Sequence, residues 1–203
     1  MTVSVEDRER IAAAIRAAEA RSAGEIVCVL ARVSADASGL STLAAAVAAL
    51  ALPWILVGAT VLPVQRILVC QVALFAALLA LFRLPAARIA LLPRRARRAI
   101  AHRLAMEQFI IRGIARKKDR CGILIFVSLA EHYARVIADD GIAAKVPQKE
   151  WQGVVDALVA HMRDGRIADG FVAAIEQCGD KLAQHFPRTE TTRDELPDRL
   201  YTI

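Results

Sequence analysis

Acidic side chains are absent from a long internal stretch of this chain. No Asp or Glu occurs between Ala37 and Met106, a run of 70 residues. Eight of the 27 basic residues lie in this run. Outside it, 19 basic residues stand against all 21 acidic ones, so the net charge of +6 arises within the run. A basic chain can bind nucleic acid, but aromatic residues are only 5% of the sequence, so we expect no nucleic-acid partner. The basic residues of the run are all arginines: Arg66, Arg83, Arg88, Arg94, Arg95, Arg97, Arg98 and Arg103.

Several other residue types and motifs are scarce. With 10 Gly, 7 Pro and 4 Cys, the chain is neither collagen-like nor a disulfide scaffold. The cysteines form no C-x-x-C pair, which suits a reduced cytoplasmic setting. The sequence contains no phosphate-binding glycine loop, no nucleophile elbow and no zinc-protease motif. The four histidines lack metal-ligand spacing. We therefore assign no catalytic residue from motifs alone.

Long apolar runs dominate the first half of the chain. Residues 37–65 carry no charge and include "LAAAVAALALPWILVGATVLP", while residues 67–82 read "ILVCQVALFAALLALF". A membrane core takes about 20 helical residues, and the shorter second run can be extended by the snorkelling arginines at its two ends. A buried soluble hairpin is the alternative, but neither run has a polar face. We predict a transmembrane hairpin at 41–84, with helices at about 41–62 and 66–84.

The arginines predict the orientation of this hairpin. The segment after it, "RLPAARIALLPRRARRAIAHR", has seven arginines and no acid, whereas the connector at 63–66 has one arginine. The positive-inside rule then places both termini in the cytoplasm. The first ten residues contain no apolar signal-peptide core. The arginine cluster could also bind anionic lipid headgroups, although a topology signal is the simpler interpretation.

The flanking sequence predicts an α/β domain. Ser4 and Asp7 resemble a capping box before a helix, and residues 25–33 form an apolar strand. After the hairpin we expect a basic helix from Pro93 to about Ala115, strands at 122–128 and 132–139, the second of them antiparallel, and two more helices. The strands at 25–33 and 122–128 are apolar on both faces, so we expect them to be neighbours. That pairing requires an even number of membrane crossings between them.

Five segments resemble the TPM-domain family, and more closely its bacterial branch of predicted membrane proteins. They are "SAGEIVCVLARVS", "MEQFIIRGI", "CGILIFVSLAEHYARVIADDGIAAKVPQKEW", "DGRIADGFVAAIEQCGDKLAQHFP" and "DELPDRL". The resemblance implies a mixed sheet flanked by helices, with the hairpin inserted. The domain parts are then 1–36 (first helix and strand), 41–84 (hairpin), 85–186 (rest of the TPM domain) and 187–203 (polar tail). It also implies a multi-pass protein of the bacterial inner membrane.

The resemblance also implies candidate activities. Some members of the family are assigned weak acid phosphatase activity, some bind calcium, and others have repair or accessory roles toward membrane proteins. The acidic loop after the third strand is the usual site, and here it contains Asp139 and Asp140. Many relatives have a "GYGLE"-like sequence there, with an acidic residue where this chain has Ala143.

The candidate metal ligands each have a simpler alternative. Asp139 and Asp140 predict a divalent-cation site, Ca²⁺ being the candidate cofactor, or else a solvated turn. Asp119 could approach the same sheet end. Glu107 could be a fourth carboxylate, or an ion-pair partner of Arg103 or Arg112 on its own helix.

Three remaining features have mainly structural interpretations. His132 and Tyr133 are interpreted as exposed residues at a strand start, and Trp151 as core. The tail around "DELPDRL" is expected to dock back on the domain.

Two functions follow as hypotheses. The first is a membrane-anchored cytoplasmic TPM-domain protein that binds membrane-protein partners in the lipid bilayer, as an accessory module. The alternative is a weak metal-dependent acid phosphatase with its carboxylate site at the strand-end loop.

Overall fold

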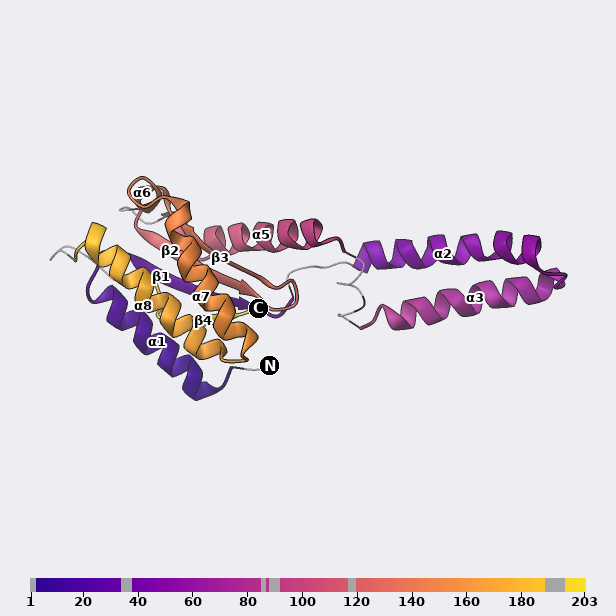
Figure 1. The fold of residues 1–203 in the computed structure, drawn as a ribbon, viewed down its shortest axis with the longest axis horizontal. Coiled ribbons are helices and arrows are strands. Elements are labelled where there is room, and N and C mark those ends of the chain that lie inside the picture. The colour runs from indigo at the N-terminus through magenta and orange to yellow at the C-terminus, as the bar shows by residue number, and fades with distance from the viewer. Residues whose placement is uncertain (1–2, 34–37, 85–86, 88–91, 117–119, 189–195) are drawn as a thin grey trace. The chain divides into compact units, whose positions relative to one another are not determined.

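The computed structural model describes residues 3–33, 38–84, 87, 92–116, 120–188 and 196–203 (Figure 1). The chain divides into two compact units. Residues 1–32 and 101–203 form the first unit, and residues 33–100 form the second. The second unit thus interrupts the first in sequence.

The first unit contains a four-stranded sheet made of β1 (Glu25–Ala31), β2 (Gly122–Ser128), β3 (Tyr133–Ala138) and β4 (Leu200–Thr202). The strand order is β3-β2-β1-β4. β1 is parallel to both of its neighbours, and β3 is antiparallel to β2. The predicted pairing of the first two strands and the antiparallel third strand are both confirmed.

β1 and β2 are buried along their whole length, because side chains pack against both faces of the sheet. Successive strand residues point to opposite faces. In β1, Ile26, Cys28 and Leu30 belong to one hydrophobic core, while Val27 and Val29 belong to the other. β2 alternates in the same way. This two-sided burial explains why both strands are continuous apolar runs in the sequence.

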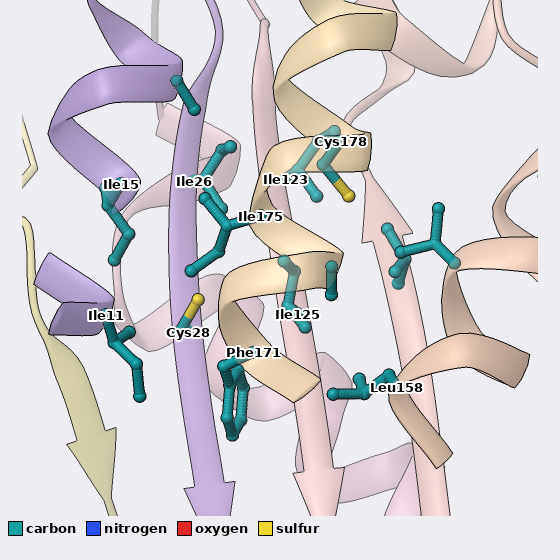
Figure 2. Packing of buried hydrophobic residues seen from close by; sticks show 14 of the residues in the cluster. Ile11, Ile15, Ile26, Cys28, Ile123, Ile125, Leu158, Phe171, Ile175 and Cys178 are labelled. Atoms are coloured by element: carbon teal, nitrogen blue, oxygen red, sulfur yellow. The ribbon is translucent and has the colours of Figure 1, made fainter. Parts of the chain in front are cut away.

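Three helices supply the larger core on the first face: α1 (Val5–Glu19), α7 (Gln152–Arg163) and α8 (Ile167–His185). Figure 2 shows Ile11 of α1 and Phe171 of α8 beside Cys28 of the sheet. All three side chains are fully buried.

Local signals fix the ends of these helices as the sequence predicts. The Ser4 hydroxyl oxygen accepts a hydrogen bond from the Asp7 backbone N–H at 3.0 Å, and the Asp7 carboxylate accepts one from the Ser4 N–H at 3.3 Å. This is the predicted capping box. Gly165, with φ of 76°, follows α7 in a left-handed conformation that glycine adopts readily.

The second face packs against α5 (Arg94–Ile111) through Ala105 and Phe109. We expected this helix to continue to about Ala115, but it ends at Ile111 and a short 3₁₀ turn, η1 (Ile114–Arg116), follows. The reason is Gly113, whose φ of 77° interrupts the helical path.

Short helical turns connect β3 to α7. We predicted a loop over "DDGIAAKV", but residues Asp140–Ala143 form one helical turn, α6. Pro147 precedes a 3₁₀ turn, η2 (Gln148–Trp151), rather than starting α7 itself. The Trp151 side chain is 1% exposed, so the core interpretation is confirmed.

The C-terminal residues belong to the domain. β4 adds to the edge of β1, where Ile203 N–H donates to the Leu30 carbonyl at 3.0 Å and Arg32 N–H donates to the Ile203 carbonyl at 2.9 Å. The guanidinium carbon of Arg112 lies 3.8 Å from the ring centre of Tyr201. The expected docking of the tail is thus confirmed at residues 200–203.

The second unit is a pair of contacting apolar helices, α2 (Ser38–Ala59) and α3 (Val64–Leu81). Pro53 lies inside α2. We placed Arg66 in the connector, but α3 begins at Val64, so Arg66 lies in its first turn. Pro63 explains the earlier start because proline, which lacks an N–H, suits the beginning of a helix.

The surface of this helix pair is apolar. Residues 41–59 and 64–81 are each long and apolar enough to cross a membrane, and only 11% and 6% of these segments are buried. Among the exposed side chains are Trp54 at 83% and Val72 at 68%. An exposed apolar surface of this kind marks an interaction site for another protein or for a membrane.

Candidate functional site

The predicted acidic loop lies where β3 meets α6, at the end of the sheet where β1 and β2 begin. The Asp139 N–H donates to the Gly122 carbonyl at 2.9 Å, which fixes the loop to the start of β2. The Asp139 side chain is 4% exposed, and its Oδ1 accepts from the Asp140 N–H at 2.7 Å. Asp139 therefore acts as the N-cap of α6. Its Oδ2 is buried and has no hydrogen-bond partner within the described part of the chain.

Asp140 faces solvent. Its carboxylate pairs with the Arg120 guanidinium at 2.8 Å, and the Asp140 side chain is 86% exposed. Gly141 lies tightly against the Arg120 backbone, since a Cβ at this position would be 2.5 Å from the Arg120 carbonyl oxygen. The two neighbouring aspartates thus have different environments: one is buried and caps a helix, and the other forms a surface ion pair.

The other two predicted carboxylates do not complete a metal site in the described structure. Glu107 accepts a hydrogen bond from Arg103 at 3.1 Å, which is the ion-pair alternative. Asp119 lies outside the described residues. Within the ranges that the structure describes, no group of three or more His, Cys, Asp or Glu side chains is arranged to hold a metal ion. Asp139 remains the residue of this set with a free buried oxygen.

A cavity of about 750 Å³ lies at the opposite end of the sheet, beside the carboxyl ends of β1 and β2. In open α/β sheets, this is the end where ligands usually bind. No motif in the sequence indicates this site. Its lining comes from the end of β1, the β2–β3 turn and the last turns of α7: Arg32, Val127, Ser128, Leu129, Ala130, His132, Tyr133, Ala134, Val159, Met162 and Arg163.

Hydrogen bonds hold the β2–β3 turn in place beside this cavity. The Ser128 hydroxyl donates to the buried Glu131 carboxylate. Leu129 N–H donates to the Ala31 carbonyl at 3.0 Å, and Ala130 N–H donates to the Arg32 carbonyl at 3.2 Å. His132 has φ of 50°, which is uncommon for a residue other than glycine. A serine and an acid three residues apart, between two strands, are the signal that could have indicated this turn.

A histidine from α5 lies close to the same turn on the other face of the sheet. His102 Nδ1 is 3.3 Å from the Tyr133 hydroxyl oxygen. Burial lowers the pKa of His102, and the charge of Arg135 lowers this pKa further. His102 therefore favours its neutral form and can serve as a hydrogen-bond partner of Tyr133. The expectation that His132 is exposed is confirmed, whereas Tyr133 is half-buried.

Two cysteines of the domain, Cys28 and Cys178, are not reactive groups. Burial raises the pKa of the Cys28 thiol well above its usual value, and burial also raises the pKa of Cys178 to about 12. Both side chains lie in the core (Figure 2). A thiolate is the nucleophilic form of cysteine, so these two residues are packing elements.

Comparisons with known proteins agree with this fold. Residues 87–181 match the TPM domain family model. An NMR structure of the BA42 protein from the psychrophilic bacterium Bizionia argentinensis is similar, with a TM-score of 0.61 and 19% sequence identity. The match covers 100% of this chain and 96% of that one, and at this identity it shows a shared fold alone. No curated protein matches the chain. Residues 87–181 therefore match the TPM domain, the family that the sequence of the chain resembles.

Proposed function

We propose that this chain is a membrane-anchored TPM-domain protein that acts as a binding or accessory module for membrane proteins. The observation that carries the proposal is the apolar helix pair α2–α3, placed in sequence between two strands that share a sheet. Strands of one sheet lie on one side of a membrane, so the chain between them crosses an even number of times. Two helices, each long enough to cross, meet this requirement.

The distribution of arginine supports a cytoplasmic domain. Arg94, Arg95 and Arg98 are exposed in the first turns of α5, shortly after the apolar helices end. Arginines concentrate on the cytoplasmic side of membrane spans. We therefore propose that both termini lie in the cytoplasm of a bacterial cell. The connector at 60–63 then lies on the opposite side of the inner membrane, away from the cytoplasm.

A binding role fits the domain better than a catalytic one. The described residues hold no metal-ligand cluster of three or more, and the sequence lacks the common catalytic motifs. The first experiment is chemical cross-linking in intact membranes, followed by purification of the full chain in mild detergent. We expect integral membrane proteins to be enriched above the level seen with an unrelated two-span protein. The absence of enrichment, together with rapid hydrolysis of a phosphate ester, would overturn the proposal.

A metal-dependent phosphatase is the second candidate, and one observation favours it. The Asp139 Oδ2 oxygen is buried with no hydrogen-bond partner among the described residues. An unsatisfied buried carboxylate oxygen is costly unless a cation or a proton compensates it. A Ca²⁺ ion needs six to eight oxygen ligands, so water, backbone carbonyls or Asp140 would have to supply the others.

The phosphatase candidate can be tested with an isosteric variant. Asparagine also caps helices well, so Asp139→Asn should fold while losing the charge that a cation needs. We expect Ca²⁺ binding, measured by calorimetry, to be lost in Asp139→Asn and retained in Glu107→Gln, whose partner is Arg103. Hydrolysis of p-nitrophenyl phosphate should likewise be lost in Asp139→Asn and retained in Glu107→Gln. Unchanged hydrolysis by Asp139→Asn would exclude this loop as the catalytic site.

A further inference from the structure

The cavity at the carboxyl ends of β1 and β2 has a mainly apolar wall. Val159 and Met162 from α7 line this space together with Val127 and Leu129 from the sheet and its turn. Its volume of about 750 Å³ lies within the usual range for small-molecule sites. The apolar wall therefore suits a ligand with a hydrocarbon or aromatic body of modest size.

The charged lining of this cavity has one sign. Arg32, at the end of β1, and Arg163, at the end of α7, both line it, and among the described residues no acidic side chain does. Neither arginine forms an ion pair with any described residue. The contrast with Arg166 is informative, because that nearby arginine pairs with Asp164 at 2.8 Å. His132 adds an imidazole ring, which can donate a hydrogen bond, to the lining.

The Glu131 carboxylate, in the turn beside this lining, is already engaged. Glu131 is 5% exposed and does not line the cavity. It accepts the Ser128 hydroxyl hydrogen. The turn that carries both residues is fixed to the end of β1 by backbone hydrogen bonds. The cavity thus combines an ordered wall with two unpaired arginines.

We propose that this cavity binds a small organic anion: an acidic group held by Arg32 and Arg163, joined to an apolar body that packs against Val159 and Met162. Guanidinium groups bind carboxylates and phosphates through charge-assisted, often bidentate hydrogen bonds. Burial of the apolar body removes its surface from water, and this contributes to the affinity. The site is at the other end of the sheet from Asp139 and does not depend on membrane insertion.

The test uses the full chain in mild detergent and phenylphosphonate as the probe, because its P–C bond resists hydrolysis. Calorimetry should detect binding of phenylphosphonate, with at least about tenfold weaker binding of inorganic phosphate and of benzamide. Inorganic phosphate lacks the apolar body, and benzamide lacks the charge. Equal affinity for phosphate and phenylphosphonate, or no binding of phenylphosphonate, would overturn the proposal.

Matched variants assign the binding to this cavity. Arg163→Gln and Arg32→Gln should each weaken phenylphosphonate binding about tenfold or more, since each removes a charge-assisted contact. Arg166→Gln removes an arginine that lies outside this lining, so it should bind as the wild type does. Val159→Trp should abolish binding by filling the cavity. If Arg163→Gln and Arg166→Gln change the affinity for phenylphosphonate equally, or if Asp139→Asn removes binding, then phenylphosphonate does not bind in this cavity.

Discussion

Cys28 and Ile125 are register partners in the parallel strands β1 and β2, although the whole apolar helix pair and α5 lie between them in the sequence. Parallel strands always need a crossover connection, which is usually a single helix. Here the crossover also includes a second compact unit. The pairing therefore requires the chain to leave the domain and to return to it. In the proposed topology, the chain accordingly returns to the same side of the membrane.

Two glycines in helices should respond in opposite ways to alanine. At Gly179 in α8, a Cβ would lie 2.7 Å from the Ala18 Cβ of α1, so the two helices would have to separate. Overpacking costs about 1–3 kcal/mol, which exceeds the gain of up to about 1 kcal/mol in helix propensity. Gly153 in α7 has open space around it. We expect Gly179→Ala to lower the free energy of unfolding and Gly153→Ala to raise it.

Urea unfolding of the full chain in detergent measures both changes. Gly153→Ala serves as the control, because it introduces the same methyl group without a neighbouring atom. Equal stabilisation by both substitutions would show that α1 and α8 do not pack as closely as the structure has them.

The aromatic ring of Tyr201 should contribute to holding the last strand. Arg112 lies 3.8 Å from the ring centre and Arg199 lies 4.7 Å from it. Cation–π contacts contribute about 0.5–1 kcal/mol at exposed sites. We expect Tyr201→Leu to destabilise the domain more than Tyr201→Phe, and hydrogen exchange to become faster at Ile203. Indistinguishable exchange in the two variants would argue against a role for the ring.

Acid should weaken the contact between α1 and α8. Arg10 donates a hydrogen bond to Asp169 at 2.7 Å, and this bond and the charge of Arg10 lower the pKa of Asp169. A lowered pKa in the folded state contributes stability above the unfolded pKa, and this stability is lost as the pH falls through the folded value. Asp169→Asn and Arg10→Gln should therefore both reduce the loss of stability below about pH 4. Identical acid unfolding curves for the variants and the wild type would contradict this.

The buried thiols should be inert in the folded chain. Because burial raises the pKa of Cys178 to about 12, almost no thiolate forms at pH 8, and the side chain is enclosed by the core. We expect iodoacetamide to modify Cys28 and Cys178 only after denaturation, as shown by peptide mass spectrometry. Rapid modification of Cys178 in the folded chain would mean that α8 opens readily.

The fold was largely predictable because its signals are local or come from burial. Ser4 and Asp7 mark the first helix through their own side chains, and the valine-rich runs mark strands that are buried on both faces. The pairing of Leu200 with Cys28 was less predictable, since a three-residue strand gives little pattern. The end of α5 depended on Gly113, one glycine in an otherwise continuous helical pattern.

The candidate sites were harder to predict from sequence. Asp139 was identified from the family resemblance, which makes the loop after the third strand the usual site, but its burial and the pairing of Asp140 with Arg120 depend on tertiary contacts. The cavity between Arg32 and Arg163 joins residues that are far apart in the chain. No spacing rule connects the end of β1 with the end of α7, so only the folded sheet brings them together.

The central claim is that residues 38–81 cross the membrane twice and return the chain to the side on which it began. Cysteine labelling of bacterial spheroplasts with a membrane-impermeant maleimide tests it directly, using Thr60→Cys between α2 and α3 and Gln184→Cys on α8. Both positions are exposed to the surroundings of the protein. We predict that Thr60→Cys is labelled in intact spheroplasts and Gln184→Cys only after permeabilisation, with Cys70 of α3 protected in both cases. Labelling of Thr60→Cys and Gln184→Cys from the same side would contradict the account.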